Sequence, residues 1–156
     1  MTLWKMPPVA KVYEALSALA DGRVRIVSPG RAEVVSSSGE KTYAVTWSED
    51  GRQVSSNDNA SIWQGYTGYP IIAVLLAAGR ISCDPAIAAQ LGGVPWHDLN
   101  ERFKRDYDAA VESVLQDIEG RGGDRAAIVR QVEVIYRQLE SLGLEHGPRR
   151  SPKPAP

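Results

Sequence analysis

Apolar residues among the first twenty positions recur at helical spacing. After Pro7 and Pro8, the large apolar side chains lie three or four residues apart: Val9, Val12, Tyr13, Leu16 and Leu19. This spacing places them on one face of a helix, and a proline in the first turn removes no intrahelical hydrogen bond. Gly22 follows, where a helix often closes on a left-handed residue. The pattern therefore predicts an N-terminal helix that ends before Gly22.

Residues 23–56 change to the composition of β-strands. Short runs rich in β-branched and aromatic residues alternate with turn sequences that contain glycine: Arg23–Ser28, Arg31–Ser36, Lys41–Trp47 and Gln53–Ser56. Consecutive strands that are joined by such short turns pair as antiparallel hairpins. The region therefore predicts an antiparallel meander of three strands, with the shorter run 53–56 as a fourth.

From residue 59 onward the signals are helical. Each predicted helix begins at a capping residue or a proline: Asn59 before a short helix from Ala60 to about Thr67, Pro70 for a buried helix ending at Gly79, Asp84 for a helix closed by Gly92, Pro95 for a long helix ending at Gly120, and Asp124 for the last helix. The order helix, strands, helices predicts the α+β class, with three or four helices packed on one face of the sheet.

The chain length fits a single domain. Its 156 residues are 43% hydrophobic and 24% charged, which is ordinary for a globular protein able to bury its own core. After Gly143 the sequence becomes basic and rich in proline, without hydrophobic periodicity. Such segments cannot bury enough apolar surface to fold. We therefore expect one globular domain over residues 1–143 and a disordered tail over residues 144–156.

The charge and the cysteine count of the chain indicate which cellular compartment and which classes of partner to expect. The formal net charge is −1, without a basic cluster, so nucleic acid is not expected to be the main partner. Cys83 is the only cysteine, the N-terminus lacks the apolar region of a signal peptide, and the longest apolar run, 71–78, is far shorter than the ~20 residues that span a bilayer. These features predict a cytoplasmic protein without a membrane segment.

The segment 55–70 is the strongest candidate for a binding surface. It combines amides, a carboxylate and aromatic rings with two intervening glycines: Asn57, Asp58, Asn59, Trp63, Gln64, Tyr66 and Tyr69. Aromatic faces offer stacking area, while amides and carboxylates orient a ligand through hydrogen bonds. A structural role competes with this interpretation, in which Asn59 caps a helix and the three aromatic residues anchor helices to the sheet. The sequence leaves both open and predicts a binding or interaction module.

An enzymatic alternative uses Asp58 with Cys83 and His97, as a small hydrolase or transferase. A cysteine nucleophile needs a base nearby, and a helix N-terminus lowers the pKa of a thiol. Cys83 precedes a predicted helix start, and His97 is one of only two histidines. However, no catalytic motif surrounds either residue. The chain also lacks paired cysteines, an HExxH motif and a calcium loop, so neither a metal nor a cofactor is expected.

The sequence offers two further candidate surfaces. The sheet would bind single-stranded nucleic acid if one face presented its basic and aromatic residues together: Arg23, Arg25, Arg31, Tyr43 and Trp47. The apolar stripe of the last helix would pair two subunits, or pack within the chain, through residues at alternating spacings of four and three: Ile128, Val132, Ile135, Leu139 and Leu142. Packing within the chain is the simpler expectation, because two heptads are too short for a coiled coil.

Overall fold

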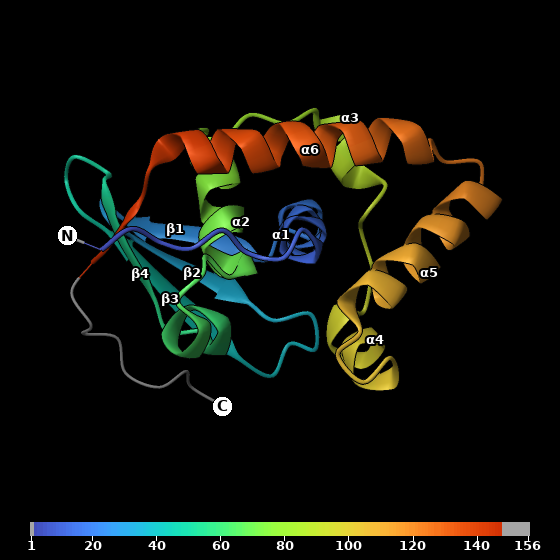
Figure 1. The fold of residues 1–156 in the computed structure, drawn as a ribbon, viewed down its shortest axis with the longest axis horizontal. Coiled ribbons are helices and arrows are strands. Elements are labelled where there is room, and N and C mark those ends of the chain that lie inside the picture. The colour runs from blue at the N-terminus through green and yellow to red at the C-terminus, as the bar shows by residue number, and fades with distance from the viewer. Residues whose placement is uncertain (1, 148–156) are drawn as a thin grey trace.

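A five-stranded sheet forms one layer of the molecule. The computed structural model describes residues 2–147, and its strands follow the order β1 (Val24–Ser28), β2 (Arg31–Val35), β3 (Thr42–Trp47), β4 (Gln53–Ser56) and β5 (Glu145–His146) (Figure 1). Strands β1 to β4 pair in antiparallel fashion, as the turn sequences predict. The α+β class and the meander, including its fourth strand, are confirmed.

The fifth strand comes from the far end of the described chain. β5 pairs in parallel with β4, Leu144 is buried before it, and Trp4 Nε1 donates to the carbonyl oxygens of Val54 and Glu145 at 3.1 Å each. The sequence predicts a disordered tail from residue 144 onward, and residues 144–147 differ from that expectation. A strand of two residues has no periodicity to detect, and its partners lie about 90 residues away along the chain. Residues 148–156 lie outside the described part.

Helix α1 (Ala10–Ala20) occupies the centre of the fold. It packs against α2 (Tyr69–Ala77), α3 (Pro85–Ala89), α5 (Tyr107–Gly120) and α6 (Arg125–Leu142), so Figure 1 shows it nearly end-on and surrounded by other elements. Its residues 10–18 are all buried. Such a helix buries its polar face as well as its apolar face, and charged residues on the polar face then require partners.

The helices cover one face of the sheet. Ala32, Val34 and Val45 alternate with less buried residues along β2 and β3. Together with Val54 of β4, they belong to the hydrophobic core. Helix α2 contacts β1, β2, β3 and β4, which explains why its sequence is apolar on every side. Asp84 and Asp124 cap α3 and α6 through bonds from Ala86 N (2.9 Å) and Ala127 N (3.0 Å), as the sequence predicts.

The prediction of one long helix from Pro95 to Gly120 is wrong. It divides into α4 (Trp96–Arg102) and α5, because Lys104 and Arg105 adopt left-handed backbone conformations with φ of 52° and 66°. Arg105 N donates to Asn100 O at 2.8 Å and Lys104 N to Glu101 O at 3.0 Å, the pair of bonds that closes a Schellman motif. Glycine usually occupies the position that Lys104 holds here. The sequence therefore contains no glycine that would indicate the end of α4.

No helix within residues 2–147 combines the length and apolarity that a bilayer-spanning segment requires.

Candidate functional site

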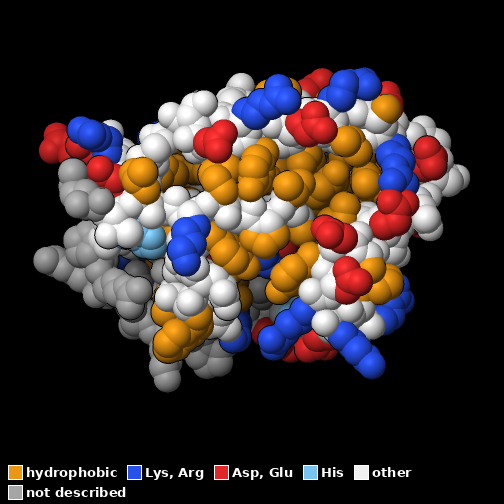
Figure 2. All heavy atoms as spheres, viewed as in Figure 1, with side chains coloured by type: hydrophobic (Ala, Val, Ile, Leu, Met, Phe, Trp, Pro, Cys, Tyr) orange, Lys and Arg blue, Asp and Glu red, His pale blue; other side chains and the backbone are white. Residues whose placement is uncertain are grey.

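A large cavity lies where the sheet, the central helix and the turn between α4 and α5 meet. Its volume is about 840 Å³, and its walls come from α1, β3, the short π-helical turn η1 (Ala60–Gln64), the start of α2, α4 and the α4–α5 turn. Figure 2 shows the molecule hollowed between η1 and α4. This volume lies within the range of about 300–1,000 Å³ that is typical of small-molecule sites.

Six of the seven residues singled out from segment 55–70 line this cavity: Asp58, Asn59, Trp63, Gln64, Tyr66 and Tyr69. The seventh, Asn57, is not among the lining residues. Its side-chain oxygen accepts a hydrogen bond of 2.8 Å from Ala44 N, so it joins the end of β4 to β3. Trp63 is 76% exposed on η1 and is therefore not a core anchor.

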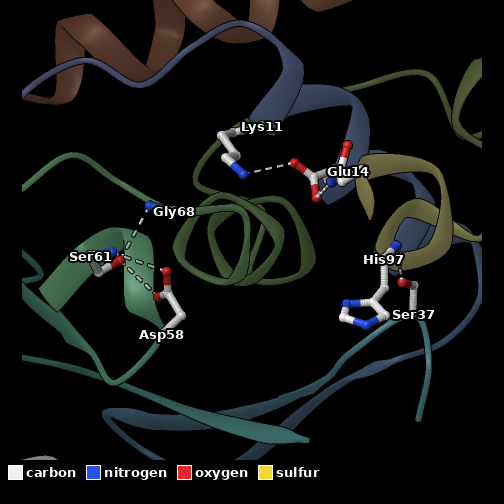
Figure 3. Close-up of polar contacts among 8 residues, drawn as sticks. Lys11, Glu14, Ser37, Asp58, Ser61, Gly68 and His97 are labelled. Carbon is white, nitrogen blue, oxygen red and sulfur yellow. Dashed lines mark hydrogen bonds and ion pairs between the residues drawn. The ribbon is translucent and has the colours of Figure 1, made fainter. Parts of the chain in front are cut away.

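Asp58 holds the corner between β4 and η1. The residue is 4% exposed, and its carboxylate accepts hydrogen bonds from Ser56 Oγ, from Ser61 N at 3.1 Å and from Ser61 Oγ at 2.7 Å. Ser61 Oγ in turn accepts a bond of 3.2 Å from Gly68 N, just before α2 (Figure 3). These four hydrogen bonds give Asp58 and Ser61 a structural role in this wall of the cavity.

The expected capping role of Asn59 is wrong. Asn59 occupies the residue before η1, but its side chain makes no capping bond, because Asp58 already accepts from Ser61 N. The turn also ends earlier than expected, at Gln64 rather than near Thr67. Gly65 follows it with φ of 72°, which terminates the helical conformation.

A buried ion pair on α1 forms part of the cavity wall. Lys11 Nζ lies 3.1 Å from Glu14 Oε2, and the two residues are 8% and 6% exposed (Figure 3). Asn100 Nδ2 donates to Glu14 Oε1 at 3.3 Å, and Lys11 Nζ lies 4.3 Å from the centre of the Tyr107 ring. The pair therefore connects α1 to α4 and α5 at the back of the site.

The protonation of this pair follows from its burial. Burial lowers the pKa of Lys11, but the negative charge of Glu14, with smaller effects from Tyr107, outweighs it, so the pKa of Lys11 lies above its ordinary value. Burial raises the pKa of Glu14, and Lys11 only partly offsets this. Lys11 is accordingly a fixed ammonium group rather than a nucleophilic amine. Sequence reasoning missed the pair, although its spacing of three residues within a predicted helix was a usable signal.

Tyrosine rings supply much of the remaining wall. Tyr43 and Tyr69 meet edge to face with ring centres 6.2 Å apart, and Tyr66 lines the same cavity. Burial raises the pKa of all three phenols, which are therefore neutral at physiological pH. Within residues 2–147 their hydroxyl groups have no protein hydrogen-bond partner. Neutral phenols without partners are donors and acceptors that a ligand or water can use.

The proposed catalytic trio is not assembled in this cavity. His97 and Asp58 both line it, but Figure 3 shows them on opposite sides, and His97 Nε2 lies 3.3 Å from Glu101. Cys83 does not line the cavity and packs against the hydrophobic core. Burial, and secondarily Asp84, raises the pKa of the Cys83 thiol, which opposes formation of a thiolate nucleophile. Within the described residues, no three potential metal ligands cluster.

The structure does not leave the sheet or the last helix as the binding surface that the sequence offered. Tyr43 and Trp47 share the helix-covered side of β3 with buried Val45, whereas Arg25 forms an ion pair of 3.1 Å with Glu33 across the β1–β2 hairpin. The basic and aromatic residues of the sheet therefore do not form one stacking face. Most of the apolar stripe of α6 is buried in the chain's own core, at Ile128, Val132, Ile135 and Leu139.

Comparison with known proteins identifies a family. No curated protein and no solved structure shows significant similarity to the chain. A family model described as "Uncharacterised conserved protein UCP014422" matches residues 4–145. The matched range runs from Trp4 to Glu145, so it includes every element that borders the cavity. The chain therefore belongs to the family of uncharacterised conserved protein UCP014422.

Proposed function

We propose that this protein binds a small molecule in the cavity between η1 and the α4–α5 turn. The observation that carries the proposal is the lining itself. A space of about 840 Å³ is bordered by aromatic side chains, by phenol hydroxyl groups without protein partners within residues 2–147, and by a buried ion pair. Sites for small molecules combine a largely aromatic or apolar wall with a few fixed polar groups in this way.

Binding is favoured over catalysis by the state of the candidate reactive groups. The Asp58 carboxylate already accepts bonds from Ser56 and Ser61, Lys11 is protonated and paired with Glu14, and Cys83 lies outside the cavity lining. Acid–base or nucleophilic chemistry requires a group that is free to reach its substrate at hydrogen-bond distance. The arrangement of these groups therefore supports binding rather than catalysis.

Trp63 provides a test with little risk of unfolding the protein. The side chain is 76% exposed on η1, so Trp63→Ala is expected to change the free energy of unfolding by less than about 0.5 kcal/mol. We expect a thermal-shift screen of a metabolite library to find compounds that raise the Tm of the wild-type protein by about 3 °C or more. The same compounds should stabilise Trp63→Ala much less, because the ring borders the cavity.

Val134→Ala is the matched control. Val134 is also an exposed apolar residue, 49% accessible on α6, but it does not line the cavity. Ligand-induced shifts should be the same in this variant as in the wild-type protein. A library without hits, or hits that stabilise Trp63→Ala as strongly as the wild type, would contradict binding in this cavity.

A further inference from the structure

Some of the charged groups that line the cavity have hydrogen-bond or ion-pair partners within the described part of the chain, and others do not. Each acidic group has a partner: Glu14 pairs with Lys11, Asp58 accepts from Ser56 and Ser61, and Glu101 lies 3.3 Å from His97 Nε2. Among the basic groups, Arg23 Nη1 donates to Val35 O at 2.7 Å, and Arg23 Nε lies 3.5 Å from Asp21.

Lys104 and Arg105 differ from these groups. Both line the cavity, and neither has an ion pair or a side-chain hydrogen bond within residues 2–147. Two adjacent positive charges that are not engaged in ion pairs can attract an anion, and an arginine beside a lysine offers several N–H donors to its oxygen atoms. The cavity therefore has a cationic border at the α4–α5 turn.

The backbone of this turn is unusual in the same place. Lys104 and Arg105 are the only non-glycine residues with positive φ in the described chain. A left-handed conformation costs such a residue roughly 1 kcal/mol, and glycine or asparagine would occupy it more easily. Strain of this kind is found at ligand clamps and active sites, where side-chain chemistry outweighs backbone preference. Here the two left-handed residues are both cations, and both line the cavity.

Trp63 and Gln64, which belong to η1 rather than to this turn, also border the cavity. The exposed indole offers a flat face for stacking, and the tyrosine rings extend the aromatic wall. We propose that the ligand is a small anion with a planar ring, whose anionic group is bound by Lys104 and Arg105 and whose ring contacts the aromatic wall. This proposal rests on small-molecule binding in the same cavity.

Matched pairs of probes test this inference directly. Isothermal titration calorimetry at about 0.15 M salt would compare adenosine monophosphate with adenosine, indole-3-acetate with indole-3-acetamide, and naphthalene-2-sulfonate with 2-naphthol. In at least one pair, the anion should bind at least tenfold more tightly than its neutral partner. The double variant Lys104→Asn/Arg105→Asn should remove most of that advantage and leave the affinity of the neutral partner unchanged.

The variant is chosen so that it folds. Asparagine accepts left-handed backbone better than lysine or arginine, so the double variant should be at least as stable as the wild-type protein. Arg102→Gln is the control, because Arg102 lies next to the turn but does not line the cavity. It should keep the preference for the anion, because salt screens more distant charges.

Several results would overturn the inference. Neutral compounds that bind as tightly as their anions would refute it while leaving small-molecule binding intact. A preference for anions that survives in Lys104→Asn/Arg105→Asn, or that is lost equally in Arg102→Gln, would refute the assigned contact. Failure of all three anions to bind would also refute it, whereas the metabolite screen with Trp63→Ala separately decides whether the cavity binds small molecules at all.

Discussion

Glu14→Gln is expected to lower the free energy of unfolding by about 3 kcal/mol at pH 7, because it leaves the buried ammonium group of Lys11 without its counter-charge. Chemical denaturation of the variant and of the wild-type protein would measure this loss. The midpoint should move to lower denaturant concentration with little change in slope. The size of the effect depends on burial, since exposed pairs contribute only about 0–1 kcal/mol.

A double-mutant cycle isolates the pair. Lys11→Met/Glu14→Gln removes both charges, so it should be clearly more stable than the sum of the two single changes predicts. Glu112→Gln is a suitable comparison, because Glu112 forms an ion pair with Arg125 that is much more exposed. If Glu14→Gln lost less than about 1 kcal/mol, or if the effects of the single changes simply added, the pair would not stabilise the fold as described.

The pH dependence of Glu14→Gln has a definite sign. In the wild-type protein, Glu14 is the main cause that holds the pKa of Lys11 above its ordinary value. Without it, burial remains and the pKa of Lys11 in the folded state falls below that value. The unfolded chain then binds more protons than the folded one between the two pKa values, so stability rises with pH in that window. The deficit of the variant relative to the wild-type protein should shrink as the pH rises from 7 towards 10.

Gly68→Ala is expected to cost about 2–3 kcal/mol of unfolding free energy. Gly68 has an ordinary backbone conformation, with φ of −70°, so alanine meets no backbone obstacle. Its Cβ would, however, overlap Asp58 Oδ2 and lie 3.1 Å from Ser61 Oγ. Both groups are buried and hydrogen-bonded to each other, so neither can move without breaking the corner between β4, η1 and α2. Thermal and chemical denaturation would measure the loss.

Gly65→Ala provides the contrast. Gly65 has φ of 72°, but no atom lies within 4 Å of a Cβ placed there. Only the left-handed backbone penalises alanine, so the expected cost is about 1 kcal/mol. If Gly65→Ala were the more damaging change, backbone freedom rather than close packing on Asp58 would determine the stability of this wall.

The sequence predicts the local features of this fold well and the long-range ones poorly. The turns at Gly30, Gly39 and Gly51 separate strands within a residue or two of their observed ends, and Asp84 and Asp124 form the predicted caps. The break at Lys104 and Arg105 was missed because Leu99, Phe103 and Tyr107 continue at helical spacing through it. Strand β5 was missed because its pairing depends on residues far away along the chain.

The candidate site, like the fold, can be predicted from the sequence only in its local part. Segment 55–70 is unusual in composition, and six of its singled-out residues border the cavity. The other walls come from α1, β3 and the α4–α5 region, which approach this segment only in the folded chain. Lys11, Tyr43, Trp96 and Tyr107 are each ordinary in their own sequence surroundings. A single sequence therefore indicates one wall of the cavity but not the shape of the cavity or its charge.

The most direct test of the central claim uses the four tryptophans as reporters. Trp63 and Trp96 line the cavity, whereas Trp4 and Trp47 do not. The indole N–H resonances of ¹⁵N-labelled protein would be followed during titration with the tightest-binding compound from the metabolite screen. Binding in the cavity predicts a saturable shift of the Trp63 resonance while those of Trp4 and Trp47 stay in place. Shifts confined to Trp4 or Trp47, or no saturable shift of Trp63, would contradict the assignment of this cavity as the binding site.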